Sequence, residues 1–116
     1  MANMAKAEKI KLGALKVSDK GYMDRNEIVA ELVDAMQKYV VQADDLAKDA
    51  SIPVVDRYNG VVNISGRFCG LSEFLNCALQ IEVRNPGTGM LYTQEMYNRI
   101  HYHETMLKIE MNRAGE

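Results

Sequence analysis

The pair Asn59-Gly60 is the feature that most restricts how this chain can fold. Asn-Gly is the preferred sequence for a two-residue type I′ turn, because both central residues of that turn need positive φ. After the pair, Val62 and Ile64 alternate with polar residues, and such alternation is typical of a half-buried strand. The segment 53–68 therefore predicts a β-hairpin.

A long helix is predicted before the hairpin. Asp24 and Glu27 have the spacing of a capping box, in which each side chain accepts a hydrogen bond from the other residue's backbone N–H. Apolar residues then recur at helical spacing: Ile28, Leu32, Met36, Tyr39, Ala43, Leu46 and Ala50. The helix either continues to Ala50 or breaks near Val40, where β-branched residues weaken it.

The remaining elements complete the expected fold. A short strand is predicted over 10–17, a short helix capped by Ser72 over 72–80, and a loop over 85–89. The last helix, over 93–112, has an apolar stripe made by Met96, Ile100, His103, Leu107 and Met111. The order strand, long helix, β-hairpin, short helix and C-terminal helix predicts an α+β fold.

Length and charge set the domain organisation and the class of partner. The chain has 116 residues, of which 47% are hydrophobic, and a formal net charge of -2. This size fits a single domain over 1–116, with residues 1–8 expected to form a loose terminus. The net charge gives no reason to expect nonspecific binding to nucleic acid or to anionic membranes, so both are disfavoured as partners.

The cysteine content and the absence of targeting signals predict a cytoplasmic protein. Cys69 and Cys77 are too few for a disulfide framework. No apolar run approaches the roughly 18 residues that cross a bilayer. The N-terminus has lysines but no apolar segment of the kind found in secretory signals.

One cluster has the residue types of a metal site, His101, His103 and Glu104. On a helix, residues two apart point away from each other, so the two histidines cannot share one ion. We therefore expect no metal and no cofactor, with His103 in the core stripe and His101 in solvent. Whether the chain is an enzyme stays open, but the sequence favours a binding protein.

A DNA-binding alternative rests on the segment 43–60. Ala43 to Ala50, followed by Ser51-Ile52, has the pattern of the first helix and turn of a helix-turn-helix. The next residues include Pro53 and Asn59-Gly60, which fit the hairpin better than a recognition helix.

A second alternative comes from a resemblance. Val54-Val55-Asp56-Arg57, followed by Val61 to Ile64, resembles a segment of the small coupling proteins of di-iron monooxygenases, in which it enters a β-strand. Gly66-Arg67-Phe68 is similar to a later turn in those proteins, and a helix between the two motifs is missing here. The resemblance implies a cofactor-free effector component of a multicomponent oxygenase.

The preferred hypothesis is a small regulatory or adaptor protein that binds a protein partner or a small ligand. Tyrosine is favoured at interfaces, and Tyr97 and Tyr102 lie off the core stripe of the last helix. The candidate binding residues are Tyr97, Tyr102, His101, Met106 and Arg57. The apolar arc of this helix is wider than one packed seam needs, so we expect a homo-oligomer that pairs through it.

Overall fold

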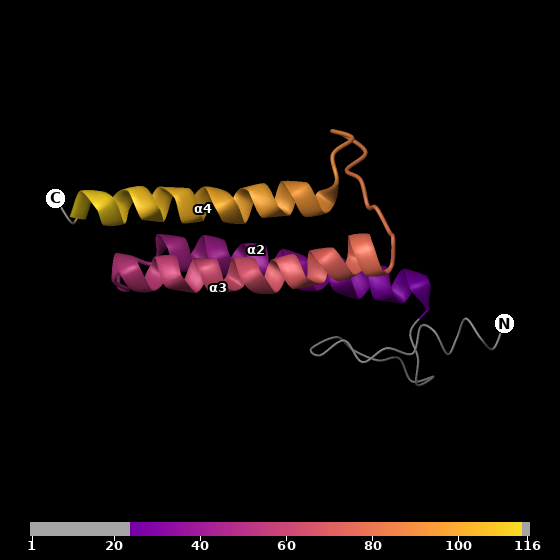
Figure 1. Ribbon diagram of the computed structural model, residues 1–116, viewed down its shortest axis with the longest axis horizontal. Coiled ribbons are helices and arrows are strands. Elements are labelled where there is room, and N and C mark those ends of the chain that lie inside the picture. The colour runs from indigo at the N-terminus through magenta and orange to yellow at the C-terminus, as the bar shows by residue number, and fades with distance from the viewer. Residues whose placement is uncertain (1–23, 115–116) are drawn as a thin grey trace. The chain divides into compact units, whose positions relative to one another are not determined.

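The computed structural model describes residues 24–114, and this part of the chain is helical. Its helices are α2 (Arg25–Lys48), α3 (Val54–Glu73) and α4 (Tyr92–Ala114), and a π-helical turn, η1 (Phe74–Ala78), continues α3 (Figure 1). The predicted α+β fold is wrong, because the described residues contain no strand and pair only at an isolated bridge between Arg84 and Leu91. The strand predicted over 10–17 and the terminus over 1–8 lie outside the described residues.

The predicted hairpin is a helix. Residues 54–73 form α3, and neither Asn59 nor Gly60 has a positive φ. The reason is a seven-residue repeat of apolar side chains, which returns each of them to the same helix face. Its members are Val54, Val61, Phe68 and Leu75, and the last three are buried. Burial of this long stripe outweighs the local preference of one Asn-Gly pair for a turn.

The predicted short helix over 72–80 is the end of this same element. η1 follows α3 without a break and ends at Ala78, and Gln80, two residues further on, has a φ of 55°. The N–H of Ile81 donates to the carbonyl of Leu75 at 3.0 Å, and the N–H of Leu79 donates to that of Phe74 at 2.9 Å. Hydrogen bonds that reach back around a left-handed residue are a common way to end a helix.

The chain divides into two compact units, Met1–Ala35 and Met36–Glu116, and the boundary falls inside α2. In the first unit, the predicted capping box is confirmed. The N–H of Glu27 donates to Oδ1 of Asp24 at 2.9 Å, and the N–H of Asp24 donates to Oε2 of Glu27 at 3.4 Å. The helix runs on without a break at Val40 and ends at Lys48.

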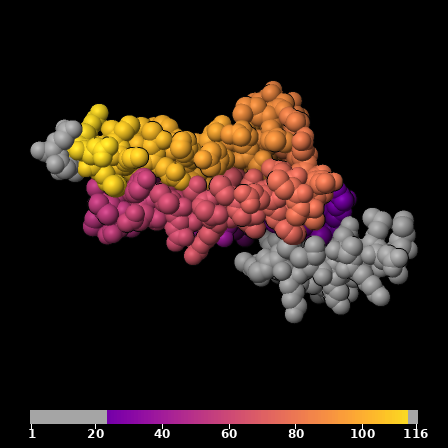
Figure 2. Space-filling model, in the orientation of Figure 1, coloured from indigo at the N-terminus to yellow at the C-terminus, as the bar shows by residue number. Residues whose placement is uncertain are grey.

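The core of the second unit is built from all of its helices. α3 and α4 run antiparallel (Figure 1), and side chains fill the gap between their ribbons (Figure 2). The buried apolar residues of this unit are Met36, Val40 and Ala43 of α2, Val61 and Phe68 of α3, Leu75 of η1, and Met96, Ile100 and Leu107 of α4. The predicted core stripe of the last helix is therefore confirmed at Met96, Ile100 and Leu107. Its other two members, His103 and Met111, are half-buried.

Candidate functional site

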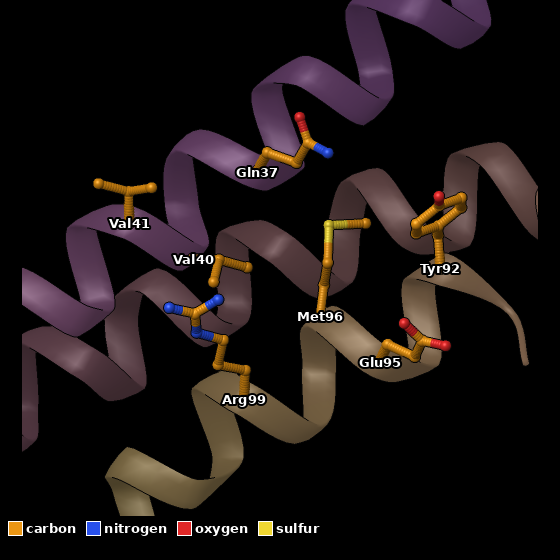
Figure 3. A pocket seen from close by; sticks show the side chains of 7 residues that line it. All are labelled: Gln37, Val40, Val41, Tyr92, Glu95, Met96 and Arg99. Carbon is orange, nitrogen blue, oxygen red and sulfur yellow. The ribbon is translucent and has the colours of Figure 1, made fainter. Parts of the chain in front are cut away.

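A groove runs between α4 and the part of α2 from residue 36 onward, and it contains two hollows. The first, which we name the Val41 hollow, has a volume of about 490 Å³. Figure 3 shows Met96 and Arg99 projecting from α4 toward α2 in this hollow. Its lining is Gln37, Val40, Val41, Tyr92, Glu95, Met96 and Arg99. Val41 is 55% exposed, so the hollow offers apolar surface to solvent.

The second, which we name the Met106 hollow, has a volume of about 400 Å³. It is lined by Ala47, Lys48, Tyr102, His103, Met106, Leu107, Ile109, Glu110 and Arg113. Three of its large side chains are open to water: Tyr102 is 59% exposed, Met106 45% and Ile109 38%. Scattered exposed apolar residues are ordinary on a protein surface, but a contiguous group marks a candidate contact site.

A charged cluster on the α2–α4 seam links the linings of the two hollows. Asp44 of α2 is buried, and its carboxylate contacts two side chains of α4. Nε2 of His103 lies 2.6 Å from Oδ1 of Asp44, and Nη2 of Arg99 lies 2.5 Å from Oδ2. Arg99 lines the Val41 hollow and His103 lines the Met106 hollow.

The cluster keeps Asp44 ionised. Burial raises the pKa of this carboxyl, but hydrogen bonds from His103 and Arg99 favour the charged form and outweigh it, so its pKa lies below the usual value of 3.8. Since an ionised carboxylate only accepts hydrogen bonds, Nε2–H of His103 is the donor. The cluster therefore ties α4 to α2 at a defined register.

Arg57, a predicted binding residue, does not line the Met106 hollow but contacts two residues that do, Ala47 and Glu110. Its Nε donates to the carbonyl of Ile52 at 2.9 Å and its Nη1 to that of Ala47 at 3.0 Å. Carbonyls in the last turn of a helix lack partners within the helix, so this guanidinium supports the end of α2. Its Nη2 also lies 3.4 Å from Oε1 of Glu110.

The other predicted binding residues fall into two groups. Tyr102 and Met106 line one hollow together. Tyr97 and His101 stack on each other, with ring centroids 5.6 Å apart. Tyr97 also lines a third hollow of about 330 Å³ with residues of α3, η1 and α4. His101 is exposed, with Nδ1 3.6 Å from Oε2 of Glu104.

Asp44, Arg99 and Val41 are functional candidates that sequence reasoning missed. Asp44 lies four residues after Val40 and three before Ala47, a spacing that places it on the inner face of α2. A carboxylate on such a face needs a cationic or hydrogen-bonding partner. The position of Asp44 on this face is therefore a signal that the sequence contains. Its partners, Arg99 and His103, lie 55 and 59 residues further along the chain, so the sequence does not identify them.

Comparison of the chain with models of known protein families, with curated protein sequences and with solved structures gives no match. Within residues 24–114, no helix combines the length and the hydropathy that spanning a bilayer requires. The same residues contain no group of three or more His, Cys, Asp or Glu side chains placed to hold a metal ion.

Proposed function

We propose that this chain is a small protein-binding module and that its binding surface is the groove between α2 and α4. The observation that carries the proposal is the row of Tyr102, Met106 and Ile109 on one helix, all exposed and all lining the Met106 hollow. Aromatic residues and methionine are enriched where proteins contact each other, and methionine adapts its shape to different partners.

The groove has the form that an α-helix of a partner would fit. Its two walls are helices, and apolar side chains line hollows along it. An amphipathic helix binds such a surface by placing residues at i, i+3, i+4 and i+7 into the apolar hollows. The charged side chains Lys48 and Arg113 beside the Met106 hollow would contact the polar face of that helix.

The charge of α3 makes nucleic acid the weaker candidate. The helix across residues 54–60 supplies the element that a helix-turn-helix reader needs. However, the exposed charged residues of α3 are Asp56, Arg67 and Glu73, two acids and one base. Phosphate contacts supply most of the affinity of a DNA-binding helix and need basic side chains.

The coupling-protein alternative loses the strand on which it rests, since residues 54–64 are helical.

A cytoplasmic location remains part of the proposal. Cys69 and Cys77 are both free thiols, which suits a reducing compartment.

The test is a selection of amphipathic helical peptides against the full chain, with binding measured by calorimetry. We expect the selected peptides to lose most of their affinity for the variant Tyr102→Lys/Met106→Glu. The variant Lys108→Glu is the control, because Lys108 is exposed on the same helix but lines neither hollow. Peptides that bind both variants as well as the original chain would show that the groove is not the binding surface.

A further inference from the structure

α4 presents a row of six side chains along the groove, and the row is symmetric about the level of Glu104. Its members are Glu95, Arg99, Tyr102, Met106, Ile109 and Arg113, and each lines one of the two hollows. The intervals between them are four, three, four, three and four residues. This heptad spacing keeps all six on one face of the helix, and it reads the same in both directions.

From this symmetry, and resting on the proposed function, we infer that the groove binds a second copy of this chain, with the two α4 helices antiparallel about a two-fold axis near Glu104. A two-fold axis pairs each residue of one copy with its reciprocal residue in the other. In this register Tyr102 meets Met106 of the second copy, Arg99 meets Ile109, and Glu95 meets Arg113. Each of these contacts occurs twice.

Charge complementarity favours the antiparallel arrangement over a parallel one. Antiparallel pairing joins the negative end of the row, Glu95, to the positive end, Arg113. A parallel pair would place Glu95 against Glu95 and Arg113 against Arg113, and like charges in contact disfavour association. Arg113 is exposed and makes no ion pair within the described residues.

The carboxylate of Glu95 is held in place for this contact. It accepts hydrogen bonds from Nδ2 of Asn85, at 3.1 Å, and from the hydroxyl of Thr88. Hydrogen bonds from Thr88 and Asn85 lower the pKa of the Glu95 carboxyl, which keeps it charged.

The apolar centre of the pairing accounts for the exposed side chains. The two Tyr102–Met106 contacts lie on either side of the axis, where an interface is most fully dehydrated, and sulfur contacts with an aromatic ring are favourable. Arg99 keeps its guanidinium on Asp44 while its aliphatic stem covers Ile109 of the second copy. Pairing therefore covers Tyr102, Met106 and Ile109, three of the large hydrophobic side chains that are exposed in the single chain.

Sedimentation equilibrium of the full chain tests the inference. We expect a dimer at micromolar concentration, and we expect Arg113→Glu to weaken it about tenfold, because two attractive contacts become repulsive. The control is Lys108→Glu, which makes the same charge change on the same helix away from the row, and which should leave the dimer unchanged. Circular dichroism of each variant verifies that it is folded.

A double reversal tests the register. Glu95→Arg combined with Arg113→Glu exchanges the two charges and should restore most of the affinity that Arg113→Glu loses. A monomer at micromolar concentration would overturn the inference, as would a dimer that Arg113→Glu and Lys108→Glu affect equally. If the chain is monomeric but the selected peptides still bind the Met106 hollow, the proposed function stands and only the second copy is excluded.

Discussion

Asp44 shows how a single buried side chain positions the groove. It is the only acidic residue among the buried residues of the described chain, and its two partners belong to α4. Removing one partner of a buried charge leaves the other without compensation, which costs more than the pair contributes. His103 is also nearly buried, with 12% of its side chain exposed, whereas the side chain of Arg99 is 63% exposed.

Substitution of Asp44 by Asn should lower the free energy of unfolding at neutral pH by about 1–3 kcal/mol, since it leaves the nearly buried donor of His103 with a weaker acceptor and removes the ion pair with Arg99. The matched control is Asp45→Asn, at an exposed neighbouring position of α2, which should change stability by less than about 0.5 kcal/mol. Urea denaturation measures both. Equal effects of the two substitutions would contradict the structure of the cluster.

Lowering the pH should remove the contribution of the Asp44 carboxylate to the stability of the folded chain. Because the pKa of Asp44 in the folded chain lies below its usual value of 3.8, the unfolded chain takes up the proton first as the pH falls. The stabilisation by Asp44 is therefore complete at pH values above the pKa that this carboxyl has in the unfolded chain. It is lost as the pH falls through the lower pKa that the carboxyl has in the folded chain. We expect the stability difference between the original chain and Asp44→Asn to shrink below about pH 4, and a difference that grows there would contradict the assignment.

Gln80 is the one non-glycine residue with positive φ in the described chain, at 55°. Left-handed backbone is unfavourable for residues with a Cβ, and glycine is preferred where a helix ends this way. Gln80→Gly should therefore raise the free energy of unfolding by about 0.5–1 kcal/mol. A loss of stability on thermal denaturation would show that the glutamine side chain has a role that the structure does not explain.

At the scale of elements, the sequence predicts best where one period is sustained over many turns. The Asp24–Glu27 capping box is confirmed, and the predicted stripes of α2 and α4 are confirmed at the positions that are buried: Ile28, Leu32, Met36, Ala43, Met96, Ile100 and Leu107. Ala50, the last member predicted for α2, lies beyond the end of that helix and is exposed. In α3 the local turn signal and the hydrophobic spacing disagree. The Asn59-Gly60 pair predicts a turn, while the repeat of Val61 and Phe68 predicts a helix. Burial along the whole element decides the outcome, and the short window around the pair does not contain that information.

The glycines of α3 distinguish the helix from the hairpin by experiment. Gly66 lies within α3, and a Cβ built on it meets nothing within 4 Å. Gly66→Ala should therefore stabilise the chain by about 0.5–1 kcal/mol, the gain expected in an exposed helix interior.

Gly60 provides the contrasting position. A Cβ there would lie 2.4 Å from Cδ2 of Leu46, so Gly60→Ala must displace that side chain and should gain less than Gly66→Ala. Chemical denaturation compares the two. A destabilised Gly66→Ala would contradict the helical account of this segment.

At the scale of the whole molecule, the contacts that form the candidate site join residues far apart in the sequence. Tyr102 and Met106 could be selected from the sequence, because they lie off the core stripe of one helix. Asp44 and Val41 could not be assigned to the same surface, since the register of α2 against α4 comes from tertiary packing. The histidines follow the sequence-based expectation: His103 contacts Asp44, and His101 lies in solvent near Glu104.

The separate environments of the two histidines lead to a prediction for the whole chain. Treatment with a chelator should leave the melting temperature unchanged, because neither histidine belongs to a group of three ligands within the described residues. Calorimetry with and without the chelator measures this. A melting temperature lowered by several degrees and restored by zinc would contradict the prediction.

The most direct test of the binding groove is a methyl NMR spectrum of the full chain labelled at methionine. Met106 lies in the groove, while Met90 is similarly exposed, at 40%, but lines neither hollow. On addition of a selected helical peptide, we expect the methyl resonance of Met106 to shift and that of Met90 to stay in place. A shift of Met90 with Met106 unchanged would contradict the assignment of this groove as the binding surface.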